Sequence, residues 1–257
     1  KMTSRIRLLL LLLLVLASPS SAAPVPDPQG EWARLAREAA EMGLPSRFLR
    51  LLPLEFVKLE FADLKNVAAE YHPESHRMVF HLSLSEGNQG KRLRPIRDIS
   101  SQDLATLYHA LFHAYFDYVD FASGTPKMTQ QGARLYEEAK RFLSCRYTVV
   151  ELSPVPPQKG VLRKQRIEKR RLTEREGWDA LNETWGVFVG WAIWNKLEAT
   201  DRLNPAARWD WDALEDFLER LDDAYSSGDL TGYFEPANAE DRTRVPRWYL
   251  APTHGIS

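Results

Sequence analysis

Two histidines four residues apart lie in the middle of the segment that most constrains this chain, residues 100–122. Ser100 is a favourable N-cap, because a serine side chain can accept a hydrogen bond from a backbone N–H in the first turn of a helix. Four residues advance a helix by roughly one turn, so His109 and His113 are predicted to project from one face, where they can share a metal ion. Apolar residues at steps of three or four predict a long amphipathic helix: Leu104, Leu107, Leu111, Tyr115 and Val119.

Residues 1–22 have the features of a secretory signal peptide. Arg5 and Arg7 precede an apolar stretch that is too short to span a bilayer, and small residues follow it. We expect cleavage after Ala22 or Ala23, and hence a secreted or periplasmic protein with no stable membrane insertion. The alternative is an uncleaved membrane anchor.

The composition is that of a globular protein with a slightly acidic balance. The formal net charge is −1, and loss of the predicted signal peptide, which has three basic and no acidic residues, would make it −4. This balance argues against nucleic acid as a partner. Cys145 is the only cysteine, so no intrachain disulfide can form, and we expect the thiol to be buried and inert.

A flexible leader is predicted at residues 23–30 and a single domain at residues 31–257. Within this domain, residues 151–172 predict a basic, proline-containing loop, which is either solvated or a docking strip for an acidic partner. The predicted fold class is α+β and mostly helical, with a small antiparallel sheet packed on the central helix and further C-terminal helices. Strands are expected at residues 56–61, 67–71 and 77–85, and the other helices at residues 31–42, 130–150, 173–198 and 210–225.

Glu183 is the best candidate for a third metal ligand, because a catalytic zinc site usually has three protein ligands and one open position. It lies in the long helix predicted after the basic loop, near Gly186 and Gly190. Each glycine costs about 1 kcal/mol in a helix interior relative to alanine, and the close approach of another backbone would explain this cost. Ala110 and Ala114 make the matching side of the central helix thin. We therefore expect the two helices to pack closely and to bring Glu183 over the histidine pair.

The sequence H-A-L-F-H at residues 109–113 resembles the H-E-x-x-H helix of the zincin metallopeptidases, specifically the gluzincin type. In that type a small sheet precedes the helix and a glutamate ligand lies on a later helix. The matching segments here are residues 77–85 and 182–185. The resemblance implies a zincin-like fold with zinc bound by the two histidines and Glu183. It also implies that the strand at residues 77–85 offers its edge to an extended peptide, with a more polar side made of Val79, His81 and Ser83.

The motif departs from the family at Ala110, where the family has a glutamate that accepts a proton from the metal-bound water. Loss of such acid–base assistance typically costs about 10²–10⁴-fold in rate. Asp117 lies about 10 Å farther along the helix axis, too far to replace the glutamate. We expect it instead to accept a hydrogen bond from the imidazole of His113 and so to orient that ring. Glu137 or Glu138 would enter the site only if the next helix folded back over it.

Three functions follow from these observations. The first is an exported zincin-like pseudo-enzyme that binds zinc and a peptide. The second is an active zinc metallopeptidase with a non-standard acid/base group, and the third is a metal-free structural or interaction domain with core histidines. Three tyrosines can each supply a phenol to an oxyanion: Tyr225, Tyr233 and Tyr249. We expect His72, His76 and His254 to be exposed, and Trp185, Trp191 and Trp194 to lie in the core.

Overall fold

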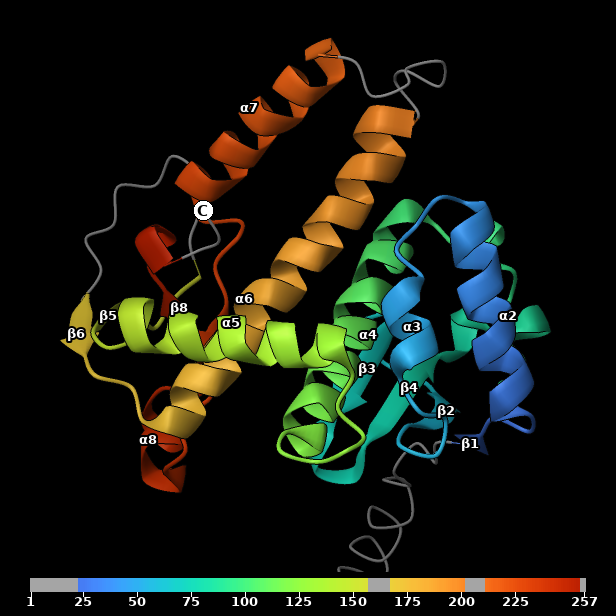
Figure 1. Cartoon of the computed structure of the whole chain (residues 1–257), viewed down its shortest axis with the longest axis horizontal. Helices are drawn as coiled ribbons and strands as arrows, with labels where there is room; N and C mark the ends of the chain where they lie inside the picture. Colours follow the sequence, from blue (N-terminus) through green and yellow to red (C-terminus); the bar gives the residue numbers. More distant parts are fainter. Residues whose placement is uncertain (1–22, 157–166, 202–210, 255–257) are drawn as a thin grey trace, which may run out of the picture.

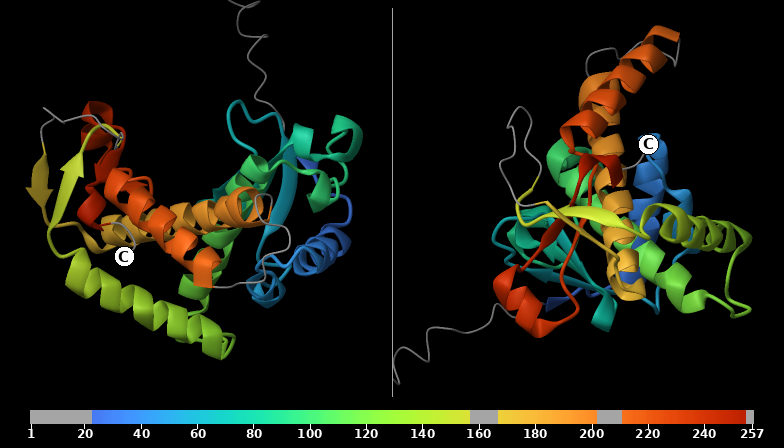
Figure 2. Two further views of the ribbon diagram at one scale, coloured as in Figure 1. Left: turned by 90° about the horizontal axis from the view of Figure 1, so that it is seen from above. Right: turned by 90° about the vertical axis from the view of Figure 1, so that its left-hand side faces the viewer.

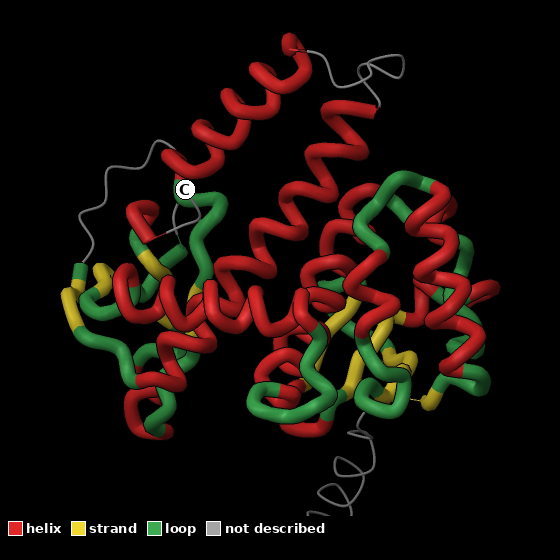
Figure 3. The backbone as a smooth tube through the Cα atoms, in the orientation of Figure 1, coloured by secondary structure: helices red, strands yellow, loops and turns green. Residues whose placement is uncertain are grey.

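The computed structural model describes residues 23–156, 167–201 and 211–254 (Figure 1). The predicted signal peptide and the middle of the predicted basic loop lie outside these ranges. Within them, no helix combines the length and apolar character needed to cross a membrane. The fold is α+β and mostly helical, as predicted (Figure 3).

The helices are α2 (Pro28–Glu41), α3 (Arg47–Leu51), α4 (Ser101–Ala122), α5 (Gln130–Arg146), α6 (Glu174–Trp194), α7 (Trp211–Ser227) and α8 (Ala239–Arg244), and a π-helical segment at Asn195–Asp201 continues α6. The strands are β1 (Ala23–Pro24), β2 (Lys58–Ala62), β3 (Ala69–His72), β4 (Arg77–His81), β5 (Val150–Ser153), β6 (Glu168–Arg170), β7 (Tyr233–Phe234) and β8 (Trp248–Leu250).

Helices α4 and α6 pack against one another in the middle of the molecule, and the two sheets lie on opposite sides of this pair (Figure 2). The Ser100 side chain caps α4 as predicted, accepting a hydrogen bond of 3.1 Å from a backbone N–H in the first turn. Thr173 and Glu176 form a capping box at the start of α6. A Cβ at Gly190 would lie 3.0 Å from the carbonyl oxygen of Ala105. The close approach of the two helices, predicted from the glycines, is therefore confirmed.

The first sheet has the strand order β1-β2-β4-β3. It is mixed rather than wholly antiparallel, because β2 and β4 run parallel. The prediction of an edge strand at residues 77–85 is wrong, since β4 lies between β2 and β3 and is followed by a 3₁₀ turn at Leu82–Leu84. Val79, expected on the polar side, is only 2% exposed. The apolar run in β4 reflects an interior strand, and the strand at that end of the sheet is β3.

The second sheet has the order β6-β5-β8-β7 and is antiparallel throughout. The sequence did not predict it, because β5 and β6 fall within or beside the predicted basic loop and β7 and β8 in the C-terminal tail. Two basic side chains of the proposed docking strip form ion pairs within the fold, Lys169 with Glu151 and Arg170 with Glu176. This sheet packs with α5 and α6 around a second apolar cluster that includes Tyr147.

The segment predicted as a flexible leader is part of the fold. Ala23 and Pro24 pair with β2 as strand β1, and Val25 is 4% exposed. The side chain of Asp27 then caps α2, which begins at Pro28, before the predicted start of that helix. Pro28 is at a favourable first position of the helix, where its missing N–H is not needed.

Several predictions of burial are wrong. Trp211 and Leu218, apolar residues in the helix predicted at residues 210–225, are 84% and 52% exposed. Cys145 is exposed near the end of α5 rather than buried. Trp185 packs in the second apolar cluster as expected, whereas Trp194 is 42% exposed.

Candidate metal centre

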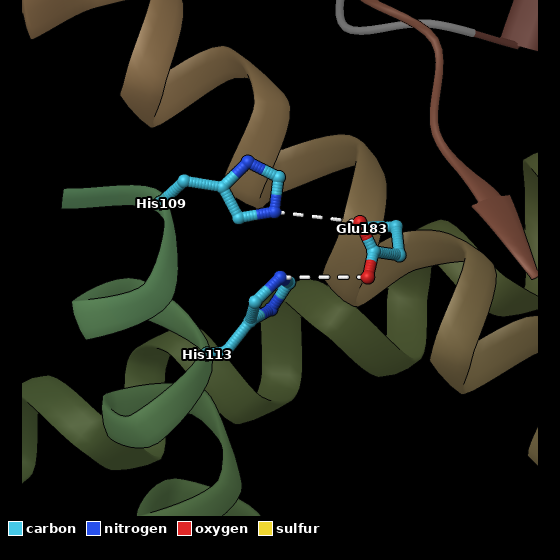
Figure 4. Close-up of side chains that lie close together, drawn as sticks. All are labelled: His109, His113 and Glu183. Atoms are coloured by element: carbon cyan, nitrogen blue, oxygen red, sulfur yellow. Dashed lines mark ion pairs between the residues drawn. The ribbon is translucent and has the colours of Figure 1, made fainter. Parts of the chain in front are cut away.

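The three predicted ligands converge between α4 and α6 (Figure 4). His109 Nε2 lies 3.4 Å from one carboxylate oxygen of Glu183, and His113 Nε2 lies 3.5 Å from the other. One ligand atom from each residue lies within 4.8 Å of the others. Four-coordinate zinc, with bonds of about 2.0–2.2 Å, needs ligand atoms about 3–4 Å apart. These side chains are therefore spaced to bind one small cation.

Gly186 makes room for the two imidazoles. A Cβ at this position would lie 2.9 Å from both His109 Nε2 and His113 Cε1, closer than real Cβ atoms approach other heavy atoms. It lies one turn after Glu183 on α6, so the thin side of the helix faces the histidines. A bulkier residue at position 186 would displace the rings from the carboxylate.

His113 is oriented by Asn182, the residue before Glu183. The Nδ1 of His113 lies 2.9 Å from the amide oxygen of Asn182, so the Nδ1–H donates to this oxygen. That hydrogen bond leaves the lone pair of Nε2 directed to the site, the arrangement usual for a metal-binding histidine. Asn182 was not predicted to have a role. A polar residue directly beside a candidate ligand was nevertheless a signal that it could orient a metal-binding side chain.

The protonation states of the half-buried ligands suit metal binding. Burial tends to raise the pKa of Glu183, but the neighbouring imidazoles of His113 and His109 outweigh it and lower the pKa. Burial also lowers the pKa of His113, against the opposing effect of the Glu183 charge. A carboxylate thus lies beside neutral imidazole at neutral pH, as a divalent cation requires. Oε2 of Glu183 is buried, and the neighbouring donor, His109 Nε2, lies 3.4 Å away without hydrogen-bond geometry, so a cation would satisfy it better.

Asp117 does not orient His113, so that prediction is wrong. Its carboxylate accepts a hydrogen bond of 2.5 Å from Tyr71 and lies 2.8 Å from Nδ1 of His76. His76, predicted to be exposed, has a left-handed backbone with φ of 50° at the turn between β3 and β4, and this backbone turns its ring toward α4. Asp117 therefore fastens the first sheet to α4 one turn beyond the site.

A cleft of about 310 Å³ opens beside the site and is lined by His113 and Glu183. Of the three tyrosines considered, only Tyr233 lines it, and its hydroxyl interacts with Glu183. Burial and the Glu183 charge raise the pKa of Tyr233, so its phenol stays protonated and able to donate a hydrogen bond. Tyr71, from the end strand β3, also lines the cleft.

Ala110, at the position where the metallopeptidases have their catalytic glutamate, does not line this cleft. Ala110 is 3% exposed and packs in the apolar cluster around the first sheet. Glu137 and Glu138 are exposed on α5 and are not part of the cleft lining, so neither folds back into the site. Besides Glu183, the carboxylates that line the cleft are Asp179 and Glu235.

Comparisons with protein-family models, curated proteins and solved structures find no significant match. What the site can bind is therefore argued from its own chemistry. Two imidazole nitrogens and a carboxylate are a donor set that zinc favours, and Asn182, Gly186 and the buried oxygen of Glu183 fit that metal.

Proposed function

We propose that this protein is an exported, zincin-like protein that binds zinc through His109, His113 and Glu183 and has lost the general base of the metallopeptidases. The observation that carries the proposal is the convergence of these three side chains from two closely packed helices. When bound there, zinc would act as a Lewis acid and lower the pKa of a bound water to about 7.

The environment of Ala110 supports a pseudo-enzyme. The residue is buried among apolar side chains, and Asp117, which follows on the same helix, is occupied by Tyr71 and His76. A zinc-bound water would lack the positioned carboxylate that the family uses to accept its proton.

The proposed ligand is an extended peptide, and β3 is the strand that supports it. β3 is at the end of its sheet and pairs only with β4 among the described strands. Tyr71 of β3 and Pro73 directly after it line the cleft. A peptide that added to this edge would form main-chain hydrogen bonds and lead into the site.

Metal analysis of protein purified without chelator tests the zinc site. We expect about one zinc per chain in the wild type and in His72→Ala, a control histidine outside the site, but strongly reduced zinc in Glu183→Gln. Less than about a tenth of an equivalent in folded wild-type protein would contradict the proposal and favour the metal-free domain.

Ala110→Glu tests whether the scaffold is a disarmed peptidase. If it is, the folded and zinc-loaded variant should gain peptidase activity over the wild type, with Ala114→Glu as a control one turn away. An unchanged rate in a folded, zinc-loaded Ala110→Glu variant would count against a catalytic origin.

A working hydrolase is the second candidate, because Asp179 lies one turn before Glu183 and lines the cleft. Burial and the charge of Glu183 raise the pKa of Asp179, while Arg175 acts in the opposite direction. A carboxyl group with a raised pKa is suited to proton transfer. Peptidase activity in the wild type that is abolished in Asp179→Asn, with zinc content unchanged, would favour this candidate.

A further inference from the structure

The cleft beside the metal site contains arginines that the proposed zinc chemistry does not use. α8 contributes Arg242, and the residue directly before β8 contributes Arg247. A third, Arg175, lies 3.9 Å from the carboxylate of Asp179 on the same helix. Two cationic side chains from the C-terminal segment are therefore available to a ligand in the cleft.

Arg247 is held in place by the residues around it. Its guanidinium carbon lies 4.0 Å from the centroid of the Tyr233 ring, and its side chain is 42% exposed. Its charge contributes to the lowered pKa of Glu183, so it acts electrostatically on the metal site. Stacking on an aromatic ring fixes the plane of a guanidinium while its N–H groups stay free to donate.

Arg247 has two internal polar partners, a hydrogen bond with the side chain of Tyr249 and a weak contact with Glu235. Glu235 approaches it only to 3.7 Å, longer than a hydrogen bond, and the Glu235 side chain is 58% exposed. Arg242 is exposed, and within the described parts of the chain its side chain has no ion pair or hydrogen bond. Arg242, and the N–H groups of Arg247 that do not bond to Tyr249, can therefore take a new anionic partner.

The charge balance of the cleft selects a singly charged group. Three arginines line it, together with three carboxylates: Asp179, Glu183 and Glu235. A dianion such as a phosphate would meet the repulsion of these carboxylates, whereas a carboxylate carries one charge and matches the planar fork of an arginine. A volume of about 310 Å³ admits a group the size of a residue or two.

We propose that the cleft binds a carboxylate of its peptide ligand through Arg247 and Arg242, with the rest of the ligand extending to the metal site. The inference rests on the proposed function, which supplies the peptide. The carboxylate is either the C-terminal carboxylate of the peptide or an acidic side chain. In both cases the recognising chemistry is the guanidinium fork.

The test is affinity selection by the zinc-loaded, full-length protein from three pools of N-acetylated tetrapeptides. The first pool has free C-termini and no acidic side chains, the second has amidated C-termini and no acidic side chains, and the third has amidated C-termini with one aspartate or glutamate. We expect about tenfold enrichment of the first or third pool over the second, because hydrogen bonds to charged groups contribute this much or more. The enriched pool identifies the source of the carboxylate.

Matched variants separate the role of Arg247 from that of general positive charge. Arg247→Gln should abolish the enrichment, Arg247→Lys should retain part of it, and Arg244→Gln, an exposed arginine on α8 that does not line the cleft, should leave it unchanged. Glu235→Gln should increase the enrichment, because it removes the carboxylate that competes for Arg247. Partial retention in Arg247→Lys excludes misfolding as the cause of the loss.

Failure of this inference is distinguishable from failure of the proposed function, because zinc content is measured in the same samples. Equal recovery of all three pools by protein that contains zinc would overturn the carboxylate site and leave the zinc site standing. Enrichment that depends on Arg247 in folded protein that takes up no zinc would overturn the zinc site and support the carboxylate site.

Discussion

Gly186→Ala is the substitution that most directly separates metal binding from folding. The added Cβ would lie 2.9 Å from His109 Nε2 and from His113 Cε1, and contact at ordinary van der Waals distance begins near 3.4 Å. The atoms that must move are the outer ends of two side chains, so the rings can turn aside without a shift of the backbone. They would then move by about half an ångström, whereas zinc–ligand distances tolerate about 0.2 Å.

The expected effects on zinc affinity and on stability are opposite in sign. Zinc affinity should fall by about 10–100-fold, comparable to the loss of an orienting group. Without zinc, the free energy of unfolding should stay the same or rise by up to about 1 kcal/mol, because alanine is the better helix former. At a free zinc concentration of about 100 times the wild-type dissociation constant, the wild type should gain about 2.7 kcal/mol from zinc and the variant much less.

Competition with a chromophoric chelator gives the affinity, and denaturant unfolding with and without zinc gives the stability. Gly177→Ala is the matched control on the same helix, because its Cβ would meet only Leu143, at 3.3 Å. It should gain the same helix propensity and bind zinc as the wild type does. A folded Gly186→Ala protein with undiminished zinc affinity would refute the reasoning that this glycine makes room for the ligands.

Three further predictions follow from the surroundings of the site. Asn182→Ala should lower zinc affinity by about 10–100-fold in chelator competition, because His113 loses the acceptor that orients it, and an unaltered affinity would contradict that role. Asp117→Ala should reduce the free energy of unfolding by about 1–3 kcal/mol, since Tyr71 and His76 lose their acceptor. Zinc content should stay at the wild-type value, and a loss of zinc would instead support the prediction that Asp117 orients His113. The lowered pKa values of His113 and Glu183 mean that the unfolded chain binds more protons than the folded chain as the pH falls through their ordinary values of 6.5 and 4.5. The melting temperature in chelator should therefore decrease with acid over this range, less steeply in a His113→Phe, Glu183→Leu double variant, and equal slopes would show that these groups are not coupled to folding.

The parts of the site that could be predicted from sequence are those determined by residues close together in the chain. The histidine spacing, the Ser100 cap and the glycines near Glu183 each depend on residues within one or two helical turns. Helix geometry then fixes which side chains share a face. The pairing of α4 with α6 could be predicted because both helices carry small residues, and a close approach of the two helices explains them.

The parts that were mistaken or missed depend on contacts between distant segments. β4 was expected at the edge of its sheet, but its position between β2 and β3 is set by topology, which strand periodicity does not contain. The strands of the second sheet have two to four residues each, too few to display an alternation. Arg247 reaches the cleft only because β8 pairs with β5 and β7, so no spacing rule connects it to Glu183.

The energetics of the site favour a ligand-binding role over a purely structural one. Gly186 and Gly190 together cost about 2 kcal/mol in helix propensity, and one carboxylate oxygen of the half-buried Glu183 lacks a well-placed hydrogen-bond donor. Replacing buried charged groups by apolar residues of similar size is often neutral or stabilising by about 1–4 kcal/mol, so a domain that needed only a packed core would fold as well or better without this site. A bound cation would reverse that balance, because it satisfies the carboxylate and both imidazoles at once and stabilises only the folded state. The destabilising features are thus concentrated where a metal ion would offset them, as the proposed zinc site requires.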